Sequence, residues 1–298
     1  MNFREFLNKE KFIVLDGPMG TELIRRGIKF KTKLWSAEAI FDNWEIIQEI
    51  YIDYIKAGTD IITTNTFRTN PWTFQKLGYS LETLEKYINR AVWIARNSIE
   101  KNKSKRRVFI AGSTSPLEDC YSPDLSPDFE TSYRYHKITT RLLKEASVDF
   151  ILIETMNTIN EALAASKAAK ETGLPVATSF VLREDARILS GEDLIEGYHK
   201  LYDVGIDIFS INCTHYSVIE IILEKLLKIV KIPVCLYVNA GILKNGKWYD
   251  DKEFTPEKYR KIALKWYKMG VKIIGGCCFT TAKYIKSINR AKKLLLNN

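Results

Sequence analysis

Eight short apolar runs, each followed by a longer amphipathic segment, restrict most strongly what this chain can fold into. The runs are rich in β-branched residues and end in small or polar ones; they span 12–17, 60–67, 107–114, 149–156, 175–182, 207–214, 233–240 and 271–278. Nearly continuous apolar strands are typical of a parallel sheet with both faces covered by helices. Eight such units predict an α/β fold, the (β/α)8 TIM barrel.

The segments between the runs carry helix signals. Apolar residues recur at helical spacing over 44–58, 83–99 and 160–173. Thr255-Pro256 predicts a helix start. Several segments close on a glycine, as helices often do: Gly58, Gly173, Gly205 and Gly270.

An open, doubly wound sheet is the structural alternative. Such a sheet normally carries a glycine-rich phosphate-binding turn after its first strand. Here that turn reads DGPMGTEL, whose glycine spacing does not match. Because no linker is visible, we expect residues 1–298 to form one barrel domain, with a long loop over 115–129 at its mouth.

Composition excludes several classes. No apolar run is long enough to cross a bilayer, and the first residues, MNFREFLNKEKF, are too charged for a signal peptide, so we expect a cytoplasmic protein without a membrane partner. The net charge of +9 raises the question of nucleic acid, but the densest basic run, 101–107, lacks interleaved aromatic residues and is interpreted as a solvated connection. Five cysteines, an odd number, favour free thiols over a disulfide framework.

The polar residues that stand out fall at the ends of the runs. In a (β/α)8 barrel the carboxyl ends of the strands form the mouth, where the chemistry takes place. The candidate site residues at these ends are therefore expected to lie near one another: Asp16, Gly17, Asn65, Thr66, Ser113, Thr114, Glu154, Asn212, Cys213, Asn239, Gly241, Cys277 and Cys278.

Three cysteines form the sharpest candidate. Cys277 and Cys278 end the eighth run, and adjacent side chains of a strand face opposite ways, so the pair indicates a strand end or turn. Cys213 ends the sixth run, two strands away in a closed ring. Three converging thiolates suit Zn²⁺ with one open position for a ligand. Buried thiols without metal, or a disulfide between neighbours, remain alternatives.

The other cysteines and histidines are weaker candidates. Cys235 is interpreted as a core residue, Cys120 as incidental, and His215 as a loop residue beside Cys213. His136 and His199 lie in helical stretches, so histidine ligands are not expected.

A three-thiolate zinc site indicates alkylation of a small thiol. A free thiol, with a pKa of about 8.5, is only a few per cent ionised at pH 7. Metal coordination removes that shortfall, because a bound thiol is deprotonated. Asp16 and Glu154 offer anionic partners for a cationic group on the thiol's carrier, although a loop-capping or ion-pairing role is equally open.

Several motifs resemble those of the homocysteine S-methyltransferase family: DGPMGTEL, LWSAEAI at 34–40, AGTDIITTNTF, IET at 153–155, INC at 211–213, VNAG at 238–241 and IGGCC at 274–278. The resemblance implies a (β/α)8 barrel that transfers a methyl group to zinc-bound homocysteine. It implies that Cys213, Cys277 and Cys278 hold the zinc and that Asp16, Gly17 and Glu154 hold the amino-acid part of homocysteine. Thr66, Phe67 and Asn239 are further substrate-binding candidates.

The methyl donor is expected to be a small sulfonium compound. The chain ends about twenty residues after Cys278, and it is most similar to the compact branch that uses S-methylmethionine, with S-adenosylmethionine as a poorer donor. Betaine, methyl-folate and other thiol or selenol acceptors are the alternatives. Trp35, Phe67 and Tyr237 are aromatic candidates for facing the cation. Arg68 departs from the family pattern, and a cation there would repel a sulfonium donor if it points inward. The 115–129 loop also differs and would reshape the donor pocket.

Two rival interpretations remain. A phosphate-binding barrel would use Gly275-Gly276 and the loop at 239–241, with incidental cysteines. A zinc-storage or zinc-sensing barrel without methyl transfer would leave Asp16 and Glu154 without a role. The sequence says nothing about oligomeric state.

Overall fold

The computed structural model describes residues 1–102, 106–244 and 247–296. Its centre is a closed ring of eight parallel strands in the order β1-β2-β3-β4-β5-β6-β7-β10, sealed by a bridge between Leu15 and Ile61. This confirms the predicted (β/α)8 barrel. The strands are β1 (Ile13–Val14), β2 (Ile61–Thr63), β3 (Phe109–Thr114), β4 (Phe150–Met156), β5 (Val176–Phe180), β6 (Ile208–His215), β7 (Val234–Asn239) and β10 (Ile273–Gly276).

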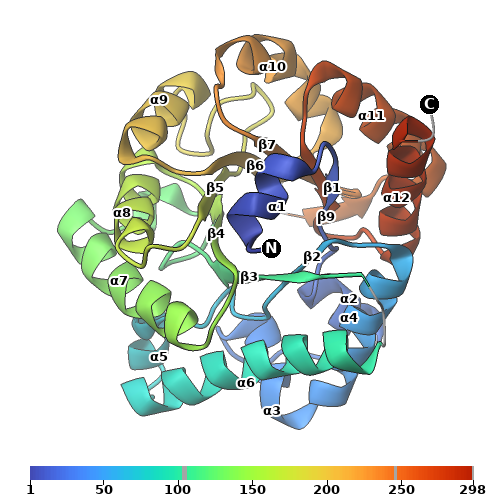
Figure 1. Cartoon of the computed structure of the whole chain (residues 1–298). Coiled ribbons are helices and arrows are strands. Elements are labelled where there is room, and N and C mark those ends of the chain that lie inside the picture. Colours follow the sequence, from blue (N-terminus) through green and yellow to red (C-terminus); the bar gives the residue numbers. More distant parts are fainter. Residues whose placement is uncertain (103–105, 245–246, 297–298) are drawn as a thin grey trace.

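Helices surround the strands, as Figure 1 shows along the barrel axis, except for the first helix, which lies in the middle of the ring. The helices are α1 (Phe3–Lys9), α2 (Gly20–Arg25), η1 (Trp35–Glu38), α3 (Ala39–Asp42), α4 (Trp44–Ala57), α5 (Pro71–Lys76), α6 (Leu81–Lys101), η2 (Pro123–Leu125), α7 (Phe129–Glu145), α8 (Ile159–Lys170), α9 (Leu194–Val204), α10 (Tyr216–Ile229), α11 (Pro256–Met269) and α12 (Ala282–Leu296). The helices predicted over 44–58, 83–99 and 160–173 are confirmed as α4, α6 and α8 with slightly shifted ends.

The predicted helix ends hold with one exception. Gly58, Gly205 and Gly270 are left-handed C-caps of α4, α9 and α11, and the Thr255 hydroxyl accepts the first-turn amide of α11. Gly173 also has a positive φ, but it lies beyond the end of α8, whose C-cap is Glu171.

Some strands differ from the prediction. β1 and β2 span only two and three residues, although Leu15 continues the pairing of β1 through its bridge to Ile61. A hairpin of β8 (Gly241–Lys244) and β9 (Lys247–Asp250) follows β7 and was not predicted.

Helix α1 covers the amino end of the barrel and appears in the middle of the ring in Figure 1. Asn2 and Glu5 form a reciprocal capping box that starts this short helix. Its apolar face, Phe3, Phe6 and Leu7, joins a core cluster with residues that point inward from the strands. The Phe3 ring stacks on Phe150 at 4.1 Å between centroids. The helix therefore fills the end of the barrel opposite to the mouth.

We expect Phe3→Ala to lower the free energy of unfolding by about 3–5 kcal/mol, because it removes a buried aromatic ring and leaves a cavity. Urea unfolding followed by circular dichroism measures this change. Ile221→Ala, on the exposed face of α10 at 65% exposure, is the control and should shift the free energy by no more than about 0.5 kcal/mol. Equal effects of the two substitutions would contradict the assignment of α1 to the core.

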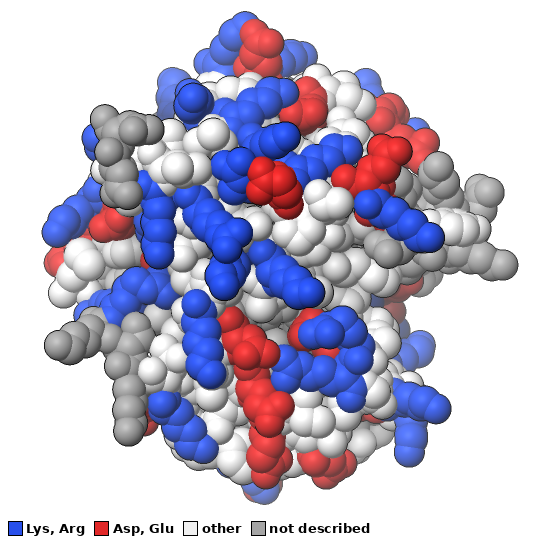
Figure 2. Space-filling view, turned by 90° about the vertical axis from the view of Figure 1, so that its right-hand side faces the viewer, with Lys and Arg blue, Asp and Glu red and all other residues white. Residues whose placement is uncertain are grey.

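Part of the surface charge is paired. In Figure 2, acidic side chains interrupt the basic ones on the face that contains α12. Lys292 and Arg106 both pair with the buried Asp60 carboxylate. The basic run 101–107 lies partly outside the described residues, but its Arg106 contributes to this structural ion pair.

Within the described residues, no helix is long and apolar enough to span a membrane.

Candidate active site at the mouth of the barrel

A cavity of about 750 Å³ opens among the carboxyl ends of the strands. Its lining includes seven of the nine residues that the sequence predicts to bind the metal or the substrate: Asp16, Gly17, Phe67, Glu154, Cys213, Cys277 and Cys278. Residues distant in the sequence thus meet at one end of the barrel, as the fold predicted.

The two glycines before the vicinal cysteines allow β10 to approach its neighbours closely. A Cβ on Gly275 would lie 2.7 Å from the Leu15 side chain, and one on Gly276 would lie 2.2 Å from the Thr280 hydroxyl. The amide of Cys277 then bonds to Val238 O at 2.8 Å, which carries the pairing with β7 past the end of the strand. Both thiols are consequently delivered to the cavity.

Cys213 reaches the same place through a strained backbone. Its φ of 51° lies in the left-handed region, which costs a non-glycine residue about 1–3 kcal/mol. The register between β6 and β7 shifts between Asn212 and His215, so β6 bulges at this cysteine. A bulge beside a site turns a side chain away from its regular strand direction. Here it directs Cys213 toward the thiols of β10.

The three sulfurs fit a tetrahedral soft-metal site. The Sγ atoms of Cys213, Cys277 and Cys278 all lie within 4.8 Å of one another. The Sγ atoms of Cys213 and Cys278 are 3.8 Å apart. Zn–S bonds of 2.3 Å at tetrahedral angles place two sulfurs about 3.8 Å apart. The predicted convergence of the thiols is therefore present, and the donor set suits zinc.

The thiols influence one another strongly. Cys277 and Cys278 can donate to the Cys213 sulfur, and this holds the pKa of Cys213 well below its usual range. The pKa values of Cys277 and Cys278 are raised in turn by the same interactions with Cys213. Negative charge is thus concentrated on Cys213 when one thiolate is present.

Two buried carboxyl groups face the same cavity. Asp16 accepts hydrogen bonds from the Thr63 amide at 2.7 Å and the Thr63 hydroxyl at 2.9 Å. Glu154 accepts from the Ser113 hydroxyl and, at 3.3 Å, from the Tyr237 hydroxyl. Burial raises the pKa of each carboxyl to about 7, with the charge of Glu154 adding to the effect on Asp16. A cation placed beside the two carboxyl groups would lower both pKa values and favour the ionised carboxylates.

Asn212 connects the strands that carry these groups. Its buried carboxamide accepts from the Thr155 amide at 2.8 Å and the Ser179 hydroxyl at 2.7 Å, and it donates to the Thr155 hydroxyl. Thr155 has a φ of 60°, and the register between β4 and β5 shifts around it. Both β4 and β6 therefore bulge at the site, and Asn212 holds the two bulges together.

The remaining substrate-binding candidates take different places. A Cβ on Gly17 would lie 2.7 Å from the Tyr54 ring, so a side chain there would collide with α4. Phe67 lines the cavity. Thr66 and Asn239 are not among the lining residues. The Thr66 hydroxyl bonds to Ser113 O at 2.7 Å, and the Asn239 side chain lies beside Cys213.

The weaker candidates lie outside the thiol cluster. Cys235 is buried in β7, and burial raises its pKa to about 12. Cys120 lies on the long loop, and burial raises its pKa as well. His215 precedes α10, where its ring nitrogens contact Ser217 at 2.7 Å and Asp251 at 3.1 Å.

The sequence did not single out Tyr121, whose hydroxyl lies 2.9 Å from the Cys213 sulfur. It lies on the loop after β3, where no periodicity indicates which side chains face the site. Ser113, which contacts Glu154, was by contrast predicted from its place at the end of the third apolar run.

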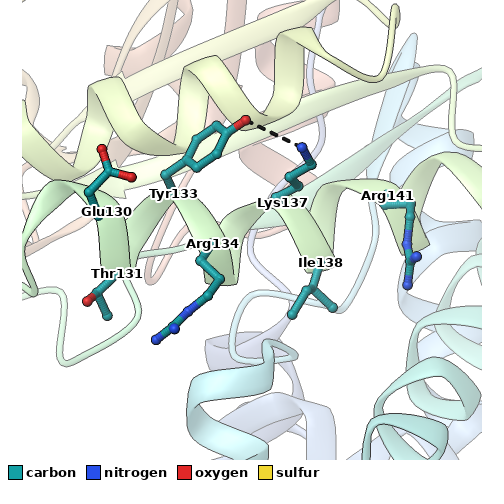
Figure 3. Close-up of a pocket in the computed structure, with 7 residues that line it drawn as sticks. All are labelled: Glu130, Thr131, Tyr133, Arg134, Lys137, Ile138 and Arg141. Carbon is teal, nitrogen blue, oxygen red and sulfur yellow. Dashed lines mark hydrogen bonds between the residues drawn. The ribbon is translucent and has the colours of Figure 1, made fainter.

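A second hollow lies on the outer surface, along α7, as Figure 3 shows. Its Lys137 is paired with Glu171 at 2.8 Å, and its Arg141 with Glu145 at 3.7 Å. No thiol or buried carboxyl group lies among its described lining residues, so it offers none of the chemistry of the mouth.

The fold and the site together define an α/β-barrel protein with a thiol-based candidate metal centre inside its mouth. Residues 13–292 match the family model for homocysteine S-methyltransferase, and the chain belongs to that family.

Similar proteins cover nearly the whole chain. Homocysteine S-methyltransferase 1 of Arabidopsis thaliana is 28% identical over 94% of this chain and 93% of its own length. Selenocysteine Se-methyltransferase of Brassica oleracea var. italica is 26% identical over 94% and 88%. The metallated form of the Escherichia coli homocysteine methyltransferase MmuM has a TM-score of 0.84 and 26% identity over 96% of this chain and 98% of that chain.

Proposed function

We propose that residues 1–298 act as one homocysteine-binding barrel that makes methionine from homocysteine and a sulfonium methyl donor at a zinc site. The observation that carries this proposal is the convergence of three sulfurs within 4.8 Å beside two buried carboxyl groups. The similarity to a metallated homocysteine methyltransferase supports a bound metal, and the set of three sulfur donors supports zinc as that metal. Cys213, Cys277 and Cys278 would hold it, and when bound it would supply a deprotonated, nucleophilic acceptor sulfur.

The protein's own residues bind and orient the acceptor. Asp16 and Glu154 hold the ammonium group, and Gly17 leaves room for the amino-acid backbone. Thr63, Ser113 and Tyr237 hold the two carboxylates in place through their hydrogen bonds. Transfer of the methyl group forms one S–C bond and breaks another, and the donor leaves as a neutral thioether. The chemistry therefore requires no general base.

The outer part of the cavity is assigned to the donor. Arg68 does not present a free charge there, because its guanidinium pairs with Asp119 at 3.3 Å and bonds to Glu118 O. It also lies over the Phe67 ring, 5.6 Å from the centroid, so that face of the ring is already occupied. Trp35 and Tyr237, which both line the cavity, are the aromatic rings we assign to the sulfonium group.

The test is an assay with purified protein. Homocysteine is offered with S-methylmethionine, S-adenosylmethionine, betaine or methyl-folate, and methionine is measured together with the zinc content. We expect about one zinc per chain and methionine from the sulfonium donors. Bound zinc without product from any donor would overturn the transferase assignment and favour a zinc-binding role. A metal-free protein would favour a phosphate-binding barrel.

Selenocysteine is the second acceptor to test, because the chain is similar to a selenocysteine Se-methyltransferase. The same carboxylates would bind its ammonium group, and selenium is also a soft ligand. The ratio of kcat/KM for homocysteine and selenocysteine with one donor decides which acceptor the site prefers.

Binding of an amino acid should weaken below pH 7. Asp16 and Glu154 have pKa values of about 7 in the empty site, and a bound ammonium group lowers them, so binding in acid releases protons. Affinity should be nearly constant from pH 8 to pH 7 and then fall roughly tenfold per pH unit for each carboxyl that must ionise.

Calorimetry with methionine measures this dependence, since methionine has no thiol proton to lose. Repeating it in two buffers of different ionisation enthalpy counts the released protons. Asp16→Asn should release fewer protons than the unchanged protein. Affinity that stays constant between pH 8 and pH 6 would contradict the assignment of the carboxyl pair to the ammonium group.

A further inference from the structure

The loop between β3 and α7 lies across the thiol site. Within residues 115–128, called the mouth loop below, several side chains line the cavity: Leu117, Glu118, Asp119, Cys120, Tyr121 and Leu125. One of them reaches the metal-ligand candidates, because the Tyr121 hydroxyl lies 2.9 Å from the Cys213 sulfur. A phenol is a stronger donor than a thiol, so the tyrosine donates and the sulfur accepts.

The mouth loop is anchored on one side by a buried carboxylate. Glu161, fully buried in α8, accepts from the Leu117 amide and from the Ser126 hydroxyl, each at 2.8 Å. His136 contacts the same carboxylate at 3.2 Å from α7. Because one carboxylate binds the loop on both sides of Tyr121, it fixes the distance that the intervening residues must span.

Arg68 anchors the other side of the loop. Its guanidinium bonds to Glu118 O and pairs with Asp119, whose carbonyl also accepts from the Asn157 side chain at 3.3 Å. The Trp72 indole donates to the Glu118 carboxylate at 2.7 Å. Arg68 and the mouth loop, the two features that depart from the family pattern, are therefore parts of one arrangement, and Tyr121 lies two residues after Asp119.

Cys213 is the thiol that most needs such support. Its positive φ is a conformation that persists only where the surroundings enforce it. Side-chain groups that hydrogen-bond to a metal ligand fix its orientation, and their removal typically costs 10- to 100-fold in metal affinity. A tyrosine that only filled space in a loop would not require its hydroxyl to meet this sulfur.

We propose that Tyr121 is a positioning residue: held by the braced mouth loop, its hydroxyl orients the Cys213 sulfur for metal binding and withdraws negative charge from it. This rests on the proposed function in one respect, that the three thiols bind zinc. In this proposal, Tyr121 of the mouth loop increases the zinc affinity of the site and lowers the electron density on the Cys213 sulfur.

The experiment compares zinc affinity, measured by competition with a chromophoric chelator and without any substrate. Tyr121→Phe keeps the ring and removes the hydroxyl, and we expect zinc to bind on the order of tenfold more weakly. Tyr135→Phe is the matched control, since Tyr135 lies in α7 and its hydroxyl contacts the Gln75 side chain of α5 at the surface. It should leave zinc affinity unchanged.

A second measurement separates charge from packing. Cobalt(II) in place of zinc gives sulfur-to-metal absorption whose energy depends on the electron density of the sulfur. Loss of the Tyr121 hydrogen bond should move this band to longer wavelength, which a packing defect alone would not do. Urea unfolding of the metal-free Tyr121→Phe protein checks that the fold is intact.

The outcomes are distinct. Wild-type zinc affinity and an unshifted cobalt band in Tyr121→Phe would overturn the inference while leaving the proposed function intact. Absence of zinc binding by the unchanged protein would overturn both. Arg68→Met, which frees one anchor of the loop, should weaken zinc binding in the same direction; full affinity in that variant would overturn the bracing by Arg68.

Discussion

Cys213→Ser is expected to abolish zinc retention and methyl transfer together. The substitution leaves two thiols, Cys277 and Cys278, where the geometry provides three sulfurs at metal-site spacing. A serine hydroxyl remains protonated at neutral pH and is a harder ligand, so it does not replace a thiolate. Without the metal, the acceptor thiol is only a few per cent ionised and is not oriented, so activity should fall by more than about 100-fold.

Zinc content after dialysis and the rate of methionine formation are the two measurements. Cys120→Ser is the matched control, because this buried thiol lies on the mouth loop and outside the cluster of three. It should retain about one zinc per chain. A Cys213→Ser protein that keeps its zinc would show that the metal is held elsewhere.

Glu154→Gln is expected to lower kcat/KM for the amino-acid thiol by about 10- to 100-fold with zinc still bound. A hydrogen bond to a charged group contributes about 1.5–3 kcal/mol, and the neutral amide loses that interaction with the ammonium group. The glutamine keeps the shape of the side chain and can still contact Ser113 and Tyr237. Loss of zinc in this variant would contradict the role assigned to Glu154.

The same substitution should stabilise the empty protein. Burial raises the pKa of Glu154 from 4.5 to about 7, so the folded state disfavours the charged form. Below pH 4.5 the group is protonated in both states and costs nothing, and the destabilisation grows as the pH rises from 4.5 to about 7, above which it is constant. At pH 8 the glutamine should therefore raise the free energy of unfolding by on the order of 2–3 kcal/mol, and at pH 4 by almost nothing. Urea unfolding at the two pH values measures the difference.

The barrel and the thiol site could be predicted from the sequence because their signals are local. Each apolar run predicts one strand, and the residues that end each strand are predicted to lie at the mouth of the barrel. The structure explains the two glycines of the IGGCC motif, since a Cβ at either position would collide with Leu15 or Thr280. Helix α1 also had a signal that was passed over: Phe3, Phe6 and Leu7 recur at helical spacing after a capping box.

Other features depend on the complete fold. The left-handed backbone at Thr155 and Cys213 occurs at residues that do not favour it, so nothing in their identity indicates a bulge. The hydrogen bond of Tyr121 to Cys213 joins residues 92 positions apart through an irregular loop. The hairpin of β8 and β9 did carry a cue, the Asn-Gly pair at 245–246, which lies outside the described residues.

Helix α1 fills the amino end of the barrel, and this affects how substrates of the proposed reaction would enter and leave. With phenylalanine rings packed into that end, the acceptor and the donor of the proposed reaction would both enter through the mouth, where the thiols line the cavity. For the proposed reaction we therefore expect sequential binding, in which the acceptor reaches the thiols before the donor enters and the demethylated donor leaves before methionine.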